Sequence, residues 1–288
     1  MDVVDAETQG MIGYELEQEL RNVLPHTTNV AALLTQVEVD PKDPAFLTPT
    51  KPIGPFYDSD PTGTMAKIDG RFRRVVASPR PKRIVEIETI KQLIQSGTVV
   101  VCAGGGGIPV TMMPNGHLEG VAAVIDKDRT SALLAECIGA DALIMLTDID
   151  SVYVDFKKPT QKKLGVVDAS SLPGKEEAWI LDQLPVGSMR PKFEAALQFV
   201  RAAGGSAWSS IGRMEDLPEI LDGTKGTRVV ASSKAQSFAI TAPIDLSFSD
   251  HWGKSVSSWT AAEVEKWLAR TVRLPPKEVQ QVCSLAKV

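Results

Sequence analysis

A short apolar stretch, residues 98–103 (TVVVCA), runs directly into four consecutive glycines. A segment so uniformly apolar is typical of a strand covered on both faces, as in a parallel sheet between layers of helices. Four glycines cost backbone entropy on folding, so we expect them where the backbone must turn sharply or approach a ligand. The junction therefore predicts a parallel strand that ends in a ligand-binding loop.

Helices and buried strands alternate on both sides of this junction. Helices are predicted over residues 7–24, 83–96, 129–138 and 192–203, and the last three are each followed by a glycine that suits a helix end. Strands are predicted at residues 29–39, 142–146 and 206–211. This alternation predicts an α/β fold, a three-layer αβα sandwich with a mostly parallel sheet, over residues 1–231.

Two segments depart from this pattern. The proline-rich stretch at residues 40–61 excludes a helix or a central strand, and we interpret residues 40–72 as a functional flap. Residues 232–256 lack periodicity and are interpreted as a linker, while residues 257–288 are predicted to be helical.

The composition excludes several classes of protein. With 31 Lys and Arg against 36 Asp and Glu, the net charge of −5 argues against non-specific nucleic-acid binding as the main activity. The three cysteines lie far apart, which fits neither a disulfide framework nor a zinc site. No apolar run approaches the ~18 residues of a membrane span, and the acidic N-terminus is unlike a signal peptide. We expect a soluble, cytoplasmic protein.

The four glycines are Gly104, Gly105, Gly106 and Gly107, and their N–H groups could surround an anion. The alternative is a plain turn. The sequence is not a Walker A loop, because no Gly-Lys-Ser/Thr follows, and it does not fit the dinucleotide-binding fingerprint.

Three lysines could supply positive charge. Lys127 stands between Asp126 and Asp128 at a strand-to-helix junction, Lys192 stands near a helix start, and Lys51 lies in the flap. A cation at a helix start opposes the helix dipole, and a bound phosphate would compensate for this. The alternative is a solvated Lys127 with Asp128 as the helix cap. Lysines and a glycine loop together indicate phosphoryl transfer, and the lack of a candidate general base fits an acceptor that is already an anion.

Several motifs carry a resemblance to a known family: TQVEVDPKDPAFLTPTKPIGPFY, RRVVASPRP, GGGGIP, GVAAVIDKD, LTDIDSVYV, GSMRPKFEAA and GTRVV. In order and spacing they resemble the carbamate kinases of the amino-acid kinase superfamily, over residues 3–231. Residues 1–231 are therefore interpreted as a carbamate kinase-like domain.

The resemblance implies Mg²⁺-dependent, reversible phosphoryl transfer between ATP and carbamate, in a cytoplasmic homodimer of arginine metabolism. Lys127 and Lys192 would neutralise the phosphoryl group, and Asp126 and Asp128 would orient the lysines and the Mg²⁺-nucleotide. The glycine loop would hold carbamate and phosphate, and Lys51 would close over them. The nucleotide would lie against Thr147, Asp148, Tyr153 and Lys192. No protein-held metal site is predicted.

Other interpretations stay open. The family's first two βα units, with their Gly-Gly-Asn and Gly-Asn-Gly-Pro loops, have no counterpart here, so residues 1–231 are interpreted as N-terminally incomplete. Alternatives are a catalytically impaired nucleotide-binding or scaffold protein, a fragment of a longer fusion, or a kinase for a larger acid. Residues 257–288 resemble the start of a sterile alpha motif domain, which could bind a protein partner, or they form one amphipathic helix.

Overall fold

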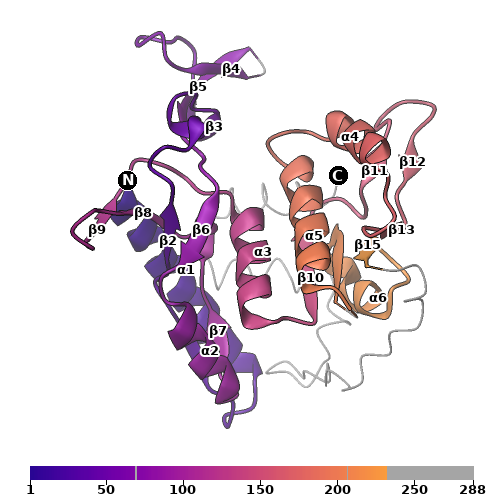
Figure 1. Ribbon diagram of the computed structural model, residues 1–288, viewed down its shortest axis with the longest axis horizontal. Helices are drawn as coiled ribbons and strands as arrows, with labels where there is room; N and C mark the ends of the chain where they lie inside the picture. The colour runs from indigo at the N-terminus through magenta and orange to yellow at the C-terminus, as the bar shows by residue number, and fades with distance from the viewer. Residues whose placement is uncertain (69, 206, 232–288) are drawn as a thin grey trace.

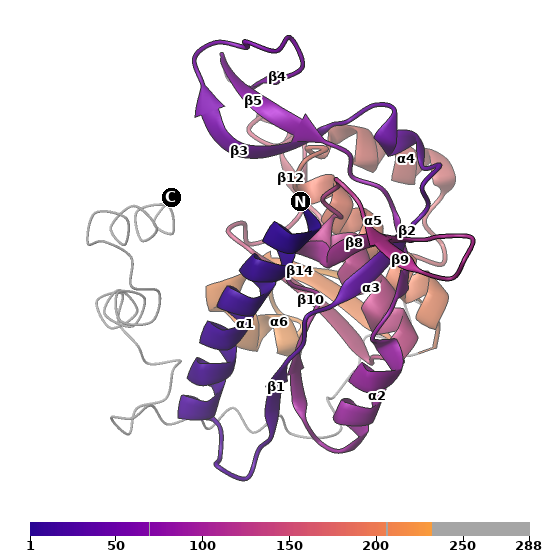
Figure 2. The same cartoon turned by 90° about the vertical axis from the view of Figure 1, so that its left-hand side faces the viewer.

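We describe the protein from a computed structural model that covers residues 1–68, 70–205 and 207–231. The predicted linker (232–256) and helical segment (257–288) lie outside these residues. The helices and 3-10 turns of the described part are α1 (Asp2–Val23), η1 (Pro44–Phe46), α2 (Ile87–Gln95), η2 (Gly104–Gly106), α3 (Lys127–Ile138), α4 (Gly174–Gln183), α5 (Met189–Ala203), η3 (Met214–Asp216) and α6 (Leu217–Asp222). Helices α1 and α6 lie on one side of the strands, and α2, α3 and α5 lie on the other (Figure 1; Figure 2). The predicted three-layer α/β architecture is confirmed.

The strands form mixed sheets. One sheet has the order β10-β14-β15-β13, another has the order β6-β2-β8-β9, and β1 pairs with β7. The pairs β1–β7, β2–β8, β10–β14 and β13–β15 are parallel, whereas β2–β6, β8–β9 and β14–β15 are antiparallel. The bounds of these strands are β1 (Val30–Ala32), β2 (Gln36–Val39), β6 (Pro81–Ile84), β7 (Val99–Val101), β8 (Ile108–Met112), β9 (Leu118–Gly120), β10 (Ala142–Thr147), β13 (Val166–Asp168), β14 (Trp208–Arg213) and β15 (Thr227–Val230).

Helix α3 joins the two halves of the core. Its buried Ala132 and Ala135 belong to the same cluster as Phe193 and Phe199 of α5, which are completely buried against β10, β14 and β15. Other α3 side chains pack on a second cluster that contains Val37 and other buried residues of β2, β6 and α2. Burying a Phe side chain contributes about 1.5–3 kcal/mol, so this packing fixes α3 between the sheets, with its N-terminus on the side of the flap (Figure 1).

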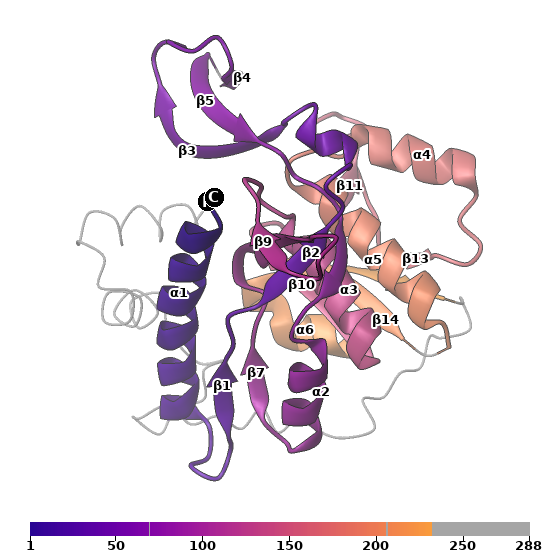
Figure 3. The ribbon, with the colours of Figure 1, turned by 60° about the vertical axis from the view of Figure 1, so that its left-hand side comes forward.

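The flap is a small antiparallel sheet of order β3-β5-β4 that stands away from the three layers (Figure 3). Its strands are β3 (Lys51–Tyr57), β4 (Ala66–Ile68) and β5 (Arg71–Val76). The exclusion of a central strand is confirmed, because β3 lies at a sheet edge, where not every N–H needs a partner. The exclusion of a helix is wrong for the short 3-10 turn η1. A second small hairpin pairs β11 (Tyr153–Val154) with β12 (Lys162–Lys163).

The predicted strand at residues 29–39 is broken into β1 and β2. Strand β1 pairs with β7, and β2 pairs with β8. The glycine loop lies between β7 and β8, so the paired strands are interrupted at the same place. Strand β7 is also less buried than predicted, since Val99 is 38% exposed. Residues 83–84 belong to β6 instead of a helix, so α2 begins only at Ile87.

Helix α1 turns an unexpected face to the sheet. The apolar residues Met11, Ile12 and Leu16 are exposed, and the buried residues of α1 are Gln9 and Gly13. The lack of a side chain at Gly13 lets α1 approach Ala32 of β1 closely. Within the described part of the chain, no helix is long and apolar enough to cross a membrane.

Candidate active site at the N-terminus of helix α3

Asp126 connects the flap to α3. Its Oδ1 accepts hydrogen bonds from the N–H groups of Asp128 (3.0 Å) and Arg129 (3.4 Å), which makes it the N-cap of α3. Its Oδ2 accepts from Nζ of Lys51 at 2.9 Å. Asp126 is only 7% exposed. The alternative in which Asp128 caps the helix is therefore wrong.

Asp128 and Lys192 form a buried ion pair between α3 and α5. Nζ of Lys192 donates to both carboxylate oxygens of Asp128 at 2.9 Å, and each side chain is 9% exposed. Lys192 lies within the first turns of α5, which begins at Met189 instead of Lys192. Because both charges are buried, each needs the other to remain charged at low cost.

Lys127 is exposed and has no ion pair among the described residues. The expectation that its two neighbouring aspartates hold it is wrong. Successive side chains of a helix point about 100° apart, and here the carboxylates of Asp126 and Asp128 pair with Lys51 and Lys192. The ammonium group of Lys127 is thus left free at the N-terminus of α3, where an anion is favoured.

The four glycines divide into two pairs. The N–H groups of Gly106 and Gly107 donate to Ala103 O and Gly104 O within the loop, both at 3.1 Å. These two glycines are buried, and a side chain there would collide with Ile125 O and with Val37. The exposed Gly104 and Gly105 remain to offer N–H groups to an anion. The expectation that all four bind a ligand is therefore reduced to two.

Three of the four predicted nucleotide residues, Thr147, Asp148 and Tyr153, lie at or shortly after the end of β10, whereas the fourth, Lys192, lies on α5. Thr147 ends β10 and donates to the carboxylate of Asp148 at 3.0 Å. The hydroxyl of Tyr153 donates to Asp150, which sequence reasoning missed, at 3.0 Å. Burial and the Asp150 charge raise the pKa of Tyr153. Among the described residues, no hydrogen bond or ion pair joins this group to the lysines of α3 and α5.

Comparison with known proteins places this geometry in a family. The profile of the Amino acid kinase family matches residues 31–208. The carbamate kinase of Haemophilus influenzae is 45% identical over 246 residues, which are 83% of this chain and 76% of that protein. The carbamate kinase of Escherichia coli K12 is 43% identical over 79% of this chain and 74% of its own length. This chain belongs to the carbamate kinases.

Solved carbamate kinase structures agree with this assignment. The Giardia lamblia carbamate kinase bound to AMP-PNP has a TM-score of 0.70 and 38% identity, covering 80% of this chain and 75% of that one. A second structure of the Giardia enzyme has a TM-score of 0.71 over a similar share.

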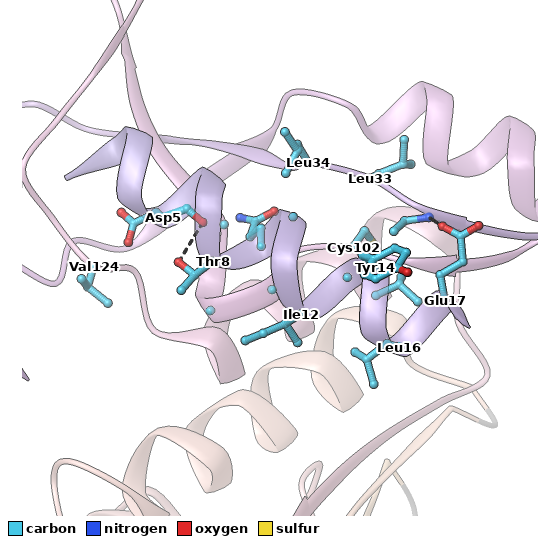
Figure 4. A pocket seen from close by; sticks show the side chains of 18 residues that line it. Asp5, Thr8, Ile12, Tyr14, Leu16, Glu17, Leu33, Leu34, Cys102 and Val124 are labelled. Atoms are coloured by element: carbon cyan, nitrogen blue, oxygen red, sulfur yellow. Dashed lines mark hydrogen bonds between the residues drawn. The ribbon is translucent and has the colours of Figure 1, made fainter. Parts of the chain in front are cut away.

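A cavity of about 470 Å³ adjoins the glycine loop on the side of α1 (Figure 4). Its walls come from α1, β1, β7 and the loop, and are mainly apolar. Its polar groups include Asp5, whose pKa is raised by burial, and Cys102, whose pKa burial raises to about 11, so that it stays a neutral thiol. None of the three site lysines lines it. The side chains of the cavity therefore offer no cation to an anion, although Gly104 and Gly105 of the loop lie in its wall.

The side chains do not fit a protein-held magnesium site. Among the described residues, no group of three or more His, Cys, Asp or Glu side chains is gathered for a metal. The two buried carboxylates, Asp126 and Asp128, are already bound to lysines. The carbamate kinase relatives imply an ATP-dependent reaction, in which Mg²⁺ can be held by nucleotide phosphates and water.

Asp126→Asn is expected to lower the free energy of unfolding by about 1–3 kcal/mol at neutral pH, because Asn keeps the helix cap but loses the charge that binds Lys51. Burial alone would raise the pKa of Asp126, but Lys51 and two backbone N–H groups hold it below its ordinary value of 3.8. The stabilisation by the charged Asp126 is thus complete at pH values above its ordinary pKa. It is lost as the pH falls through the lowered pKa of the folded protein.

Urea unfolding of the wild type and of Asp126→Asn at several pH values measures the difference in their free energies of unfolding. We expect it to be constant between about pH 5 and 7 and to narrow below about pH 4. A difference that widens as pH falls would contradict the assignment.

Proposed function

We propose that this chain catalyses reversible phosphoryl transfer between ATP and carbamate, forming ATP from carbamoyl phosphate and ADP in one direction. The observation that carries the proposal is the free ammonium of Lys127 at the N-terminus of α3, next to the glycine loop. The sequence similarity to carbamate kinases supports the choice of substrates. We further propose a cytoplasmic homodimer.

Phosphoryl transfer needs positioning and positive charge more than covalent chemistry. In our proposal a carbamate oxygen attacks the γ-phosphorus of ATP, an O–P bond forms, and the bond from phosphorus to the β,γ-bridging oxygen breaks. No proton has to be removed, because the carbamate oxygen is already an anion. Lys127 and Lys192 neutralise the charge on the phosphoryl oxygens, and the N–H groups of Gly104 and Gly105 bind carbamate and phosphate.

The buried carboxylates act on the lysines. Asp128 binds Lys192 and fixes its Nζ between α3 and α5. Asp126 holds Lys51 of β3 and so ties the flap to the site. Thr147, Asp148 and Tyr153 contact the nucleotide in our proposal, and Mg²⁺ binds with the nucleotide phosphates.

Lys51→Met is expected to lower kcat/KM for carbamoyl phosphate by about 10- to 100-fold, because it removes a cation and frees the flap from Asp126. Lys42→Met removes an exposed lysine that precedes β3 in the chain and serves as the control. Equal rates for the two variants in steady-state kinetics would remove Lys51 from the site.

The proposed function is tested by luciferase detection of ATP formed by the full chain from ADP, Mg²⁺ and carbamoyl phosphate. Acetyl phosphate, which carries the same acyl phosphate group but lacks the carbamoyl nitrogen, is the comparison donor. We expect ATP from carbamoyl phosphate at a rate well above that from acetyl phosphate. A folded chain that forms no ATP, or that prefers acetyl phosphate, would overturn the proposal.

A further inference from the structure

The glycine loop follows a residue, Ala103, whose backbone conformation is disfavoured for a residue with a side chain. Ala103, which precedes it, has φ of 55°, although residues with a side chain rarely adopt positive φ. Gly105, Gly106 and Gly107 follow with φ of 67°, 110° and 90°. The conformation of Ala103 persists only where the surrounding structure fixes it, so side chains that hold this residue also set the direction of the N–H groups that follow.

Thr35, between β1 and β2, fastens both ends of the loop. Its Oγ1 accepts from Ala103 N at 2.9 Å, just before the glycines, and donates to Leu33 O at 3.0 Å. Its carbonyl oxygen accepts from Ile108 N at 2.8 Å, just after the glycines. Thr35 is completely buried. One residue therefore fixes the entry and the exit of the loop.

Two further side chains complete the support. The amide of Gln9, on the buried face of α1, donates to Thr35 O at 3.3 Å and accepts from Thr35 N at 3.0 Å. On the opposite side, the completely buried Thr130 of α3 donates from Oγ1 to Gly106 O at 2.8 Å. This contact ties the loop to the helix whose N-terminus carries Lys127.

We propose that Gln9, Thr35 and Thr130 are positioning residues of the phosphoryl-transfer reaction. They hold the N–H groups of Gly104 and Gly105 at a fixed distance from the Lys127 ammonium, so that both act on the same carbamoyl phosphate. This inference rests on the proposed function. A misplacement of about 1 Å is enough to cost up to ~100-fold in rate.

Thr35→Val, which keeps the shape of Thr35 but loses Oγ1, is the test, with Thr35→Ser as the conservative control. For Thr35→Val we expect kcat/KM for carbamoyl phosphate to fall by about 10-fold or more, with KM for ADP unchanged within about twofold. Thr35→Ser is expected to recover most of the activity. A folded Thr35→Val with wild-type kinetics, or an equal loss for both substrates that Thr35→Ser fails to rescue, would overturn the proposal.

Amide hydrogen exchange supplies a readout that does not depend on activity. We expect exchange at residues 103–108 to be faster in Thr35→Val than in the wild type, while the interior of α5 is unchanged. Gln9→Met, which removes the second contact at similar volume, repeats the test if Thr35→Val does not fold. Unchanged exchange at residues 103–108 in a folded variant refutes the positioning role. Faster exchange there in the variant, together with a wild type that makes no ATP, contradicts only the proposed function.

Discussion

Lys127→Ala is expected to lower kcat for ATP formation from carbamoyl phosphate by about 100-fold or more, while leaving the melting temperature unchanged. The loss follows from the free ammonium at the N-terminus of α3, which we propose stabilises the charge on the transferred phosphoryl group. Stability should be unaffected, because Lys127 is exposed and has no ion pair among the described residues. Steady-state kinetics and thermal unfolding of the same preparations measure both effects.

Lys175→Ala is the matched control, since it removes an exposed lysine from the first turn of α4. It should leave both kcat and the melting temperature at wild-type values. A rate for Lys127→Ala within twofold of this control would remove Lys127 from the chemistry.

Asp128→Ala, unlike Lys127→Ala, is expected to destabilise the fold, by about 3–5 kcal/mol. The reason is that Lys192, 9% exposed, would keep a buried charge without the carboxylate that now binds it at 2.9 Å. Urea unfolding measures the loss. Activity should fall as well, because Nζ of Lys192 would no longer be held between α3 and α5.

A double variant separates stability from chemistry. Asp128→Ala combined with Lys192→Met removes both charges, and we expect it to recover part of the stability but none of the activity. Asp58→Ala, which removes an exposed partner of Arg71 on the flap, should cost no more than about 1 kcal/mol. A cost of this small size for Asp128→Ala would show that the buried pair is unimportant for folding.

Local signals in the sequence predicted the helices that build the site. Gly139 and Gly204 mark the ends of α3 and α5, where a residue without a side chain accepts positive φ, and the structure has both ends there. The candidate residues of the VIDKD motif were found in the same way, as an extended chain entering a helix.

Long-range contacts could not be predicted. Lys51 and Asp126 are 75 positions apart, and nothing local indicates that Asp126 binds the flap lysine while Asp128 binds Lys192. The buried face of α1 was not predictable either, because Gly13 allows close packing on β1 that apolar periodicity does not reveal. Thr35 was missed for the same reason, since its importance comes from the loop folded against it.

The most direct measurement follows the phosphorus itself. ³¹P NMR of the full chain with carbamoyl phosphate, ADP and Mg²⁺ distinguishes ATP from free phosphate as the product. We expect the carbamoyl phosphate signal to be replaced by the γ-phosphate of ATP, and this conversion to be lost in Lys127→Ala. Release of inorganic phosphate alone, or no conversion by folded wild-type protein, would contradict direct transfer at this site.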